Sequence, residues 1–520
     1  MFPDSAIAKQ LSVGKTKVAY IMAWGLAPFF HQSLIDWIKK SEEFTVCFDE
    51  ALNKVVQRGQ MDLHVRYWCA EEHVVKSRYL TSAFMNRATA NDIVQKFTSA
   101  LSEVPCERML QVSMDGPNVN WKFFDIFQNQ FKQSHDGTKL LVVGSCGLHV
   151  VHGSLQYGHK AAGWSVNGQL RAMYNLFKDS PARRAQYTET TSSTMYPLKF
   201  CQVRWVENRK VAERALIVLP NVKKYVSSAK LPATVTSNNV KQLCSDPLAA
   251  AKIAFFASIA STLEPFLIKY QSSAPLMPFL YDNLMALLRS LMSRYVKRDI
   301  VDKAKTASDL YKIDVLSKDI RRLYKDVDIG VAATKLLTES KVSQAAKMEF
   351  QMQSMEFLAA TTGKIVERSP LQYKIVRAVS CLVPHKIVNN STVCESRMVE
   401  FVQILYDAKR VSADIADKAK LQFSILCRKA TDDLKSTFRN YDRSEELDEF
   451  YYEVLGNDHD AAELWLVVRK VLVLSHENAN VESGFSVNKD ILVDNMHEES
   501  VVAQRVVYDG VHDAGDIMSV

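Results

Sequence analysis

Hydrophobic and polar residues alternate with a period of two soon after residue 43, a pattern that predicts β-strands. The clearest stretch is Met61–Cys69, and a polar turn at Glu71 and Glu72 separates it from the next one. We therefore expect an antiparallel meander of three strands, preceded by a helical segment over residues 1–43. The three strands are expected at Phe44–Asp49, Met61–Cys69 and Val74–Thr81.

Helical and strand patterns then alternate up to about residue 160. Ile93, Phe97 and Leu101 recur at fourfold spacing, which predicts one face of a helix. Two short apolar runs, Leu110–Met114 and Lys139–Val143, predict two more strands, each followed by a helix. The order β-β-β-α-β-α-β-α is that of the ribonuclease-H-like fold, so we expect an α/β core with a mixed five-stranded sheet. In that arrangement the first and fourth strands lie side by side and parallel.

A large all-α insertion is expected to interrupt this core, because the strand pattern nearly vanishes after Ala161. Asp246 and Pro247 have the residue types of an N-cap and a first helical position, and they open a helix over Leu248–Tyr270. A buried apolar element returns near Leu464. We therefore expect five segments. They are a helical segment (residues 1–43), the first part of the core (44–160), the insertion (161–455), a return to the core with a dimerisation-like segment (456–500), and an acidic tail (501–520).

Composition places the chain among ordinary globular proteins, with 47% hydrophobic and 24% charged residues in 520. The nine cysteines include no CxxC pair, which favours reduced thiols and a nuclear or cytoplasmic location over secretion. No signal-peptide pattern is present at Met1. The longest apolar stretch, Ile253–Ile268, is too short for a bilayer and is broken at Glu264 and Pro265, so we expect no membrane segment.

Charge is distributed unevenly along the chain, whose net charge is +7. Residues 160–230 contain 13 Lys and Arg against 4 Asp and Glu, whereas residues 441–520 contain 5 against 18. A basic middle suits a surface for a polyanion such as DNA, although a merely solvated basic face is the alternative. Arg204 and Trp205 could contact phosphate and stack on a base, or be a surface Arg beside a core Trp. The candidate nucleic-acid-binding residues are Arg183, Arg184, Arg204, Trp205, Arg209 and Lys210.

Two apolar runs end in an aspartate, at Asp49 and Asp115. On neighbouring parallel strands these carboxylates would meet and form half of a divalent-metal site, while the alternative is that each is an ordinary turn residue. Cys146 and His149, followed by His152, have zinc-like residue types. A closed zinc site needs four ligands, and no second CxxC or HxxxH is present, so we expect a structural CxxH and no zinc.

These motifs, in their order, resemble the hAT superfamily of DNA transposases. The resemblance is carried by Phe48-Asp49, Met114-Asp115-Gly116-Pro117-Asn118, Cys146-x-x-His149, Arg204-Trp205 and Val481-Glu482-x-x-Phe485-Ser486. It implies a ribonuclease-H-like core with an all-α insertion, and Glu482 as the third catalytic carboxylate beside Asp49 and Asp115. By the same resemblance, the three would hold two Mg²⁺ or Mn²⁺ ions for DNA strand transfer, Trp205 would stack near a flipped base, and the segment after Glu482 would support a homodimer.

The chain departs from the family pattern in ways that bear on activity. Family members usually carry an N-terminal BED zinc finger, and no Cys/His finger stands before Phe44. Ser483 replaces a commonly basic residue, and Gly484 weakens a helix by about 1 kcal/mol relative to Ala. We therefore favour a domesticated, transposase-derived nucleic-acid-binding protein with a degenerate site. The alternatives are an active Mg²⁺-dependent strand-transferase, a protein-interaction scaffold, and an exonuclease, which needs more strand-end carboxylates than the pair Asp49-Glu50.

Overall fold

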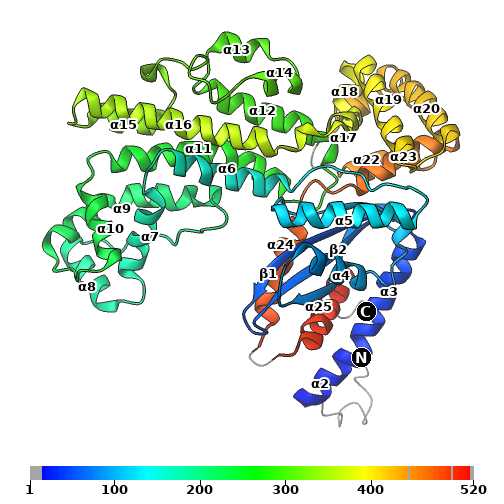
Figure 1. Cartoon of the computed structure of the whole chain (residues 1–520), viewed down its shortest axis with the longest axis horizontal. Coiled ribbons are helices and arrows are strands. Elements are labelled where there is room, and N and C mark those ends of the chain that lie inside the picture. Colours follow the sequence, from blue (N-terminus) through cyan, green and yellow to red (C-terminus); the bar gives the residue numbers. More distant parts are fainter. Residues whose placement is uncertain (1–13, 443–445, 494–495, 516–520) are drawn as a thin grey trace. The chain divides into compact units, whose positions relative to one another are not determined.

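The computed structural model describes residues 14–442, 446–493 and 496–515, and the chain forms two compact units. Unit 1 comprises Met1–Cys146, Tyr270–Tyr281 and Gln372–Val520, and unit 2 comprises Gly147–Lys269 and Asp282–Leu371. Unit 1 contains the β-sheet, which Figure 1 shows in blue. Residues 372–455, which are part of the predicted insertion, belong to unit 1 by this division.

The sheet of unit 1 has four strands in the described residues, in the order β3-β2-β1-β4. The meander β1-β2-β3 is antiparallel, as expected. β1 and β4 are parallel neighbours, with Cys47 opposite Ser113, which confirms that the first and fourth strands lie side by side. The strands are β1 (Phe44–Asn53), β2 (Arg58–Cys69), β3 (Val74–Met85) and β4 (Met109–Ser113).

The expected fifth strand at Lys139–Val143 is not a strand of this sheet. Leu140, Leu141 and Val143 are buried as predicted, and the Leu141 N–H donates to the Leu110 carbonyl at 2.8 Å. However, the Lys139 N–H donates to the carbonyl of Ala408 at 3.0 Å, so the segment does not continue a ladder along β4. The mixed sheet is therefore four-stranded in the described part of the chain.

Helices cover both faces of the sheet. Phe48 on β1 packs edge-on against Phe97 and Phe123, with ring centroids 5.5 and 5.2 Å away, so α4 and α5 lie on one face. α23 and α24 pack against β2, and α24 also contacts β1 and β3. Because side chains alternate along a strand, Cys47 and Asp49 face away from the Phe48 side. These helices are α4 (Ala90–Ala100), α5 (Asn118–Ser134), α23 (Ala462–Val473) and α24 (Ala479–Ile491).

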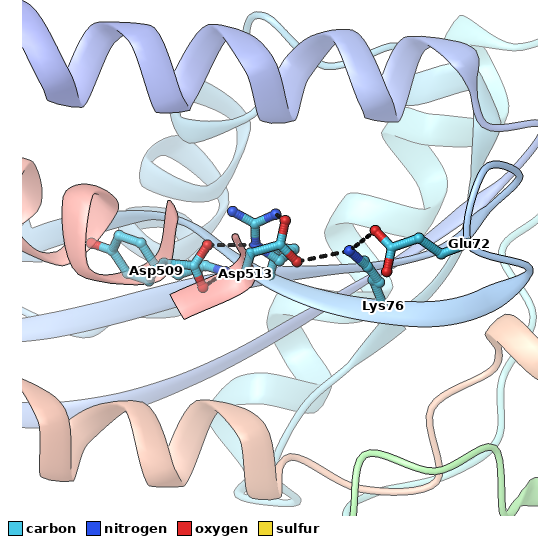
Figure 2. Close-up of polar contacts among 6 residues, drawn as sticks. Glu72, Lys76, Asp509 and Asp513 are labelled. Carbon is cyan, nitrogen blue, oxygen red and sulfur yellow. Dashed lines mark hydrogen bonds and ion pairs between the residues drawn. The ribbon is translucent and has the colours of Figure 1, made fainter. Parts of the chain in front are cut away.

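The last helix, α25 (Glu498–Asp513), is fixed to the edge strand β3 by charged groups (Figure 2). Arg78 Nε donates to Asp509 at 2.7 Å, and Arg78 also binds Asp513. Lys76 bridges Asp513, at 3.0 Å, and Glu72. A second oxygen of Asp509 accepts the backbone N–H of Tyr79 at 3.1 Å, which satisfies an edge donor of the sheet.

The remaining helices of unit 1 flank this core. The N-terminal segment is helical where it is described, and residues 1–13 of the predicted helical segment lie outside the described residues. A π-helical turn, Met22–Leu26, joins its two α-helices. The flanking elements are α2 (Lys15–Ile21), α3 (Ala27–Lys40), α17 (Lys374–Ala378), α18 (Pro384–Asn389), α19 (Ser391–Asp407), α20 (Ala413–Thr431), α21 (Lys435–Arg439) and α22 (Leu447–Tyr451).

Unit 2 is built from helices in its described residues, apart from an isolated bridge between Val296 and Arg321. Its α11 begins as predicted, because the Asp246 carboxylate accepts the Leu248 N–H at 2.8 Å. The long pair α6 and α16 packs closely at Gly158. The elements are α6 (Gly147–Ala161), α7 (Val166–Phe177), α8 (Pro181–Thr191), α9 (Arg209–Ser228), α10 (Val235–Ser245), α11 (Ala249–Tyr270), α12 (Leu280–Ser293), α13 (Arg298–Lys303), α14 (Ala307–Lys312), α15 (Val331–Glu339) and α16 (Gln344–Arg368).

Two helical stretches of the described chain, Lys15–Lys40 and Ala249–Tyr270, have the length and apolar composition of a membrane span. In Ala249–Tyr270, 61% of the most apolar window is buried, which is typical of a core helix. In Lys15–Lys40 the buried share is 17%. Length and composition alone are weak evidence, because core helices and signal sequences have the same properties.

Candidate acidic site at the end of the sheet

Asp49 and Asp115 lie beyond the same end of the β1–β4 ladder. Cys47 pairs with Ser113 in the parallel ladder, and each aspartate stands two residues beyond this pair. The predicted strand end at Asp49 is wrong, because Asp49 still pairs with Asp62 of β2 and β1 continues to Asn53, whereas Asp115 lies in the loop between β4 and α5. The parallel pairing therefore brings the two carboxylate-bearing segments together, as the sequence predicts.

The third segment, which carries Glu482, is attached to these two strand ends by Asn478. The Asn478 side chain is 1% exposed; its Nδ2 donates to the Phe48 carbonyl at 3.0 Å, and its Oδ1 accepts from Ser113 Oγ at 2.8 Å. Asn478 immediately precedes α24, and Glu482 lies in the first turn of that helix. One buried amide thus links the residue before Asp49, the end of β4 and the start of the Glu482 helix.

A second side chain of β4 holds the same connecting segment. Gln111 donates to the Ser475 carbonyl at 2.9 Å and accepts the Ser475 N–H at 2.8 Å. Both residues are buried, so this pair satisfies backbone groups that would otherwise be costly to remove from water. The Gln111 and Asn478 contacts were not predicted, because single polar residues in apolar runs give no indication of their partners.

Close packing around α24 explains why position 484 is a glycine, which the sequence alone does not reveal. A Cβ atom there would lie 3.0 Å from Arg505 Nη2 and 3.2 Å from His64 Nε2. The glycine therefore lets α24 approach β2 and α25 closely, which offsets its low helix propensity. Burial, followed by the Arg505 charge, lowers the pKa of His64 to about 3, so this ring is neutral near pH 7.

Negative charge accumulates beside Asp115. Burial and the Asp115 charge raise the pKa of Glu50, so the two carboxylates sense one another. Glu50 Oε1 is buried and has no hydrogen-bond partner within the described residues. A concentration of carboxylate oxygens of this kind suits Mg²⁺ or Mn²⁺, which prefer oxygen ligands.

Asp115 also lies close to Cys146 of the CxxH motif. Both residues belong to unit 1, and they offer ligand atoms within 4.8 Å of one another. Within the described residues, neither Asp49 nor Glu482 joins them in a group of ligand atoms of this size. One sulfur and one oxygen donor do not complete a zinc site, which needs four ligands.

The predicted nucleic-acid-binding residues all lie in unit 2, and several hold its own helices together. Arg183 and Arg184 donate to the carbonyls of Leu176 and Phe177, at 3.1 and 3.0 Å, and so cap the end of α7. Arg209 pairs with Glu264 at 3.0 Å. Arg204 pairs with Glu207 at 3.5 Å, and Lys210 is exposed at the start of α9.

Trp205 is a core residue, only 4% exposed. Its Nε1 donates to the Gln202 carbonyl at 2.8 Å, and its ring contacts Phe200 and His159 with centroids 5.4 and 5.2 Å away. Of the two interpretations of the Arg204-Trp205 pair, this placement fits a core tryptophan beside an arginine nearer the surface.

Comparison of the sequence with models of known families gives no match, and comparison with curated proteins gives no significant match.

Proposed function

We propose that this chain is a nucleic-acid-binding protein derived from a hAT-type transposase, with a divalent-metal site at the end of a ribonuclease-H-like sheet. One observation carries the proposal: Asn478 bonds to both β1 and β4 beside their two aspartates and starts the helix of Glu482. The order of the three carboxylates along the chain and the parallel pairing of β1 with β4 support the same conclusion.

The chemistry follows from the oxygen ligands. Divalent ions held by Asp49, Asp115 and Glu482 would activate an attacking hydroxyl and stabilise the leaving oxygen at a DNA phosphorus. The chain's own contribution is positional, because the β1–β4 ladder and a helix start hold the segments that carry the carboxylates. Glu50 adds negative charge next to Asp115. Asp115 is near Cys146 as well, so a metal held by that thiolate would compete for its carboxylate.

Nucleic-acid binding is assigned to the basic region of residues 160–230. This region has 13 basic residues against 4 acidic ones, and Lys210 and Lys224 are among the exposed bases of α9. Contacts of this type are electrostatic, so affinity falls steeply with salt concentration. Because the Trp205 ring is buried, phosphate contact is a better basis for binding than base stacking.

A plasmid-nicking assay with Mg²⁺ or Mn²⁺ tests the metal site. Asp115→Asn should lower metal-dependent nicking by about 100-fold or more, since neutralising one ligand of a two-metal site removes transition-state stabilisation. Asp125→Asn, an exposed aspartate on α5, makes the same chemical change away from the site and should leave nicking unaltered. Metal-dependent nicking that survives Asp115→Asn would exclude the site.

A second candidate, binding without cleavage, is favoured by the absence of Asp49 and Glu482 from the group of ligand atoms around Asp115. In the same assay it predicts no nicking by the wild-type protein, together with retention of DNA that weakens steeply between low and moderate salt. Failure to retain DNA even at low salt would contradict both candidates.

A further inference from the structure

A buried carboxylate holds the far end of the Glu482 helix. Asp62 of β2 is fully buried and accepts three hydrogen bonds, from Gln60 Nε2 at 2.7 Å, Ser82 Oγ at 2.6 Å and Asn488 Nδ2 at 2.6 Å. The first two donors lie on the sheet itself, and Asn488 lies on α24. Asp62 therefore accepts a hydrogen bond from a helix that lies more than 400 positions later in the chain.

The donors on the sheet are themselves held in place. Asn53 Nδ2 donates to Gln60 Oε1 at 2.7 Å, and the Tyr79 hydroxyl shares a hydrogen bond with Ser82 Oγ at 2.5 Å. Burial raises the pKa of Asp62, while the bonds from Ser82, Gln60 and Asn488 and the charge of Arg505 act in the opposite direction. The buried carboxylate therefore has two donors that the sheet itself holds in place, an arrangement more demanding than apolar packing.

The two buried asparagines at the start and near the end of α24 bracket Glu482. Asn478 anchors the start of the helix on β1 and β4, and Asn488, ten positions later, anchors it on β2. At 1.5 Å per residue the anchors are about 15 Å apart along the helix axis. Between them Val481 and Gly484 are buried, so both anchors restrain the helical turn that carries Glu482.

We infer that Asp62 is a positioning residue: through Asn488 it sets the direction of α24 across the sheet and thereby holds Glu482 at the strand ends. This inference rests on the proposed metal site. It goes beyond that proposal because it assigns a role to a carboxylate, Asp62, that lies outside the proposed ligand set, on β2 directly opposite Asp49.

A swap of the two side chains tests the inference. Asn488→Asp places two carboxylates in contact and removes the donor, whereas the double variant Asp62→Asn with Asn488→Asp restores one N–H to oxygen bond in the reverse direction. The amide oxygen introduced at position 62 would still accept from Gln60 and Ser82. Ser486→Asp adds the same charge at an exposed position of α24 and is the matched control.

The readout is the Mn²⁺ dissociation constant at neutral pH, and the loss of affinity in Glu482→Gln measures the contribution of Glu482. Asn488→Asp should reduce this contribution at least tenfold. The double variant should restore it to within threefold of wild type. Ser486→Asp adds the same charge one turn after Glu482 but keeps the anchor, so it should not weaken Mn²⁺ binding. Equal affinity in wild type and Asn488→Asp, or no recovery in the double variant, would overturn the positioning role.

Hydrogen exchange of the α24 amides separates this inference from the metal site. Asn488→Asp should speed exchange over residues 481–488, and the double variant should return it toward the wild-type rate, whether or not Mn²⁺ is present. Wild-type protein that binds no Mn²⁺ would refute the proposed function. Unchanged exchange in Asn488→Asp would refute the anchor independently.

Discussion

Single buried groups in this protein have properties that their residue types alone do not suggest. His64 is an imidazole on a strand, and burial lowers its pKa to about 3. Its neighbours are the Arg505 guanidinium and the Tyr79 ring, whose centroid is 5.6 Å away. His152 and His159 of unit 2 are also buried, with the pKa lowered to about 3 and about 4. The sequence alone does not distinguish these three histidines from the others. Their burial in the folded protein keeps them neutral.

Acid should destabilise unit 1 through His64. The folded state keeps His64 neutral down to about pH 3, whereas the unfolded chain binds a proton near pH 6.5, so stability is present above pH 6.5 and is lost as the pH falls. His64→Gln should remove about 1.4 kcal/mol per pH unit of this dependence between about pH 6 and pH 4. Urea unfolding of both proteins at several pH values across this range measures the difference. Parallel pH profiles would contradict it.

At the scale of elements, the sequence predicts what depends on local pattern and misses what depends on distant partners. The meander and the helix start at Asp246 are visible as alternation and cap residues. Lys139–Val143 has the apolar run of a strand, yet the Lys139 N–H bonds to Ala408 of a distant segment, which no local pattern reveals. The Asp62–Asn488 and Gln111–Ser475 contacts were missed for the same reason.

We expect the largely buried ion pair that attaches α25 to β3 to contribute more to stability than an exposed ion pair does. The side chains of Arg78 and Asp509 are 10% and 15% exposed, and Asp509 also accepts the Tyr79 N–H. Asp509→Ala leaves Arg78 and an edge N–H without that partner, and should lower the free energy of unfolding by about 3 kcal/mol.

The matched control for this change is Asp302→Ala, which breaks an exposed pair with Arg298. These side chains are 63% and 88% exposed, and the cost should be below about 1 kcal/mol. Urea unfolding followed by circular dichroism compares the two variants. Equal effects would show that α25 is held by its apolar contacts, among them Ala503 and Val506, and not by the charges.

At the scale of the whole molecule, the chain returns to its sheet after a long helical excursion to place Glu482. The hAT resemblance makes Asp49, Asp115 and Glu482 the candidate metal ligands, because of their order in the sequence. The structure adds the parallel pairing of β1 with β4 and the Asn478 link. It also places Asp115 next to Cys146, a neighbour that the spacing of the CxxH motif does not indicate. This contact depends on where the loop after β4 runs, which is a tertiary property.

The proposed divalent-metal site takes its three carboxylates from distant segments of the chain. The most direct test is a crystal structure of the full chain with Mn²⁺, in which anomalous scattering locates the ions. We predict Mn²⁺ beyond the end of the β1–β4 ladder, ligated by Asp49, Asp115 and Glu482. Mn²⁺ bound by Asp115 with Asp49 and Glu482 taking no part would contradict the proposal.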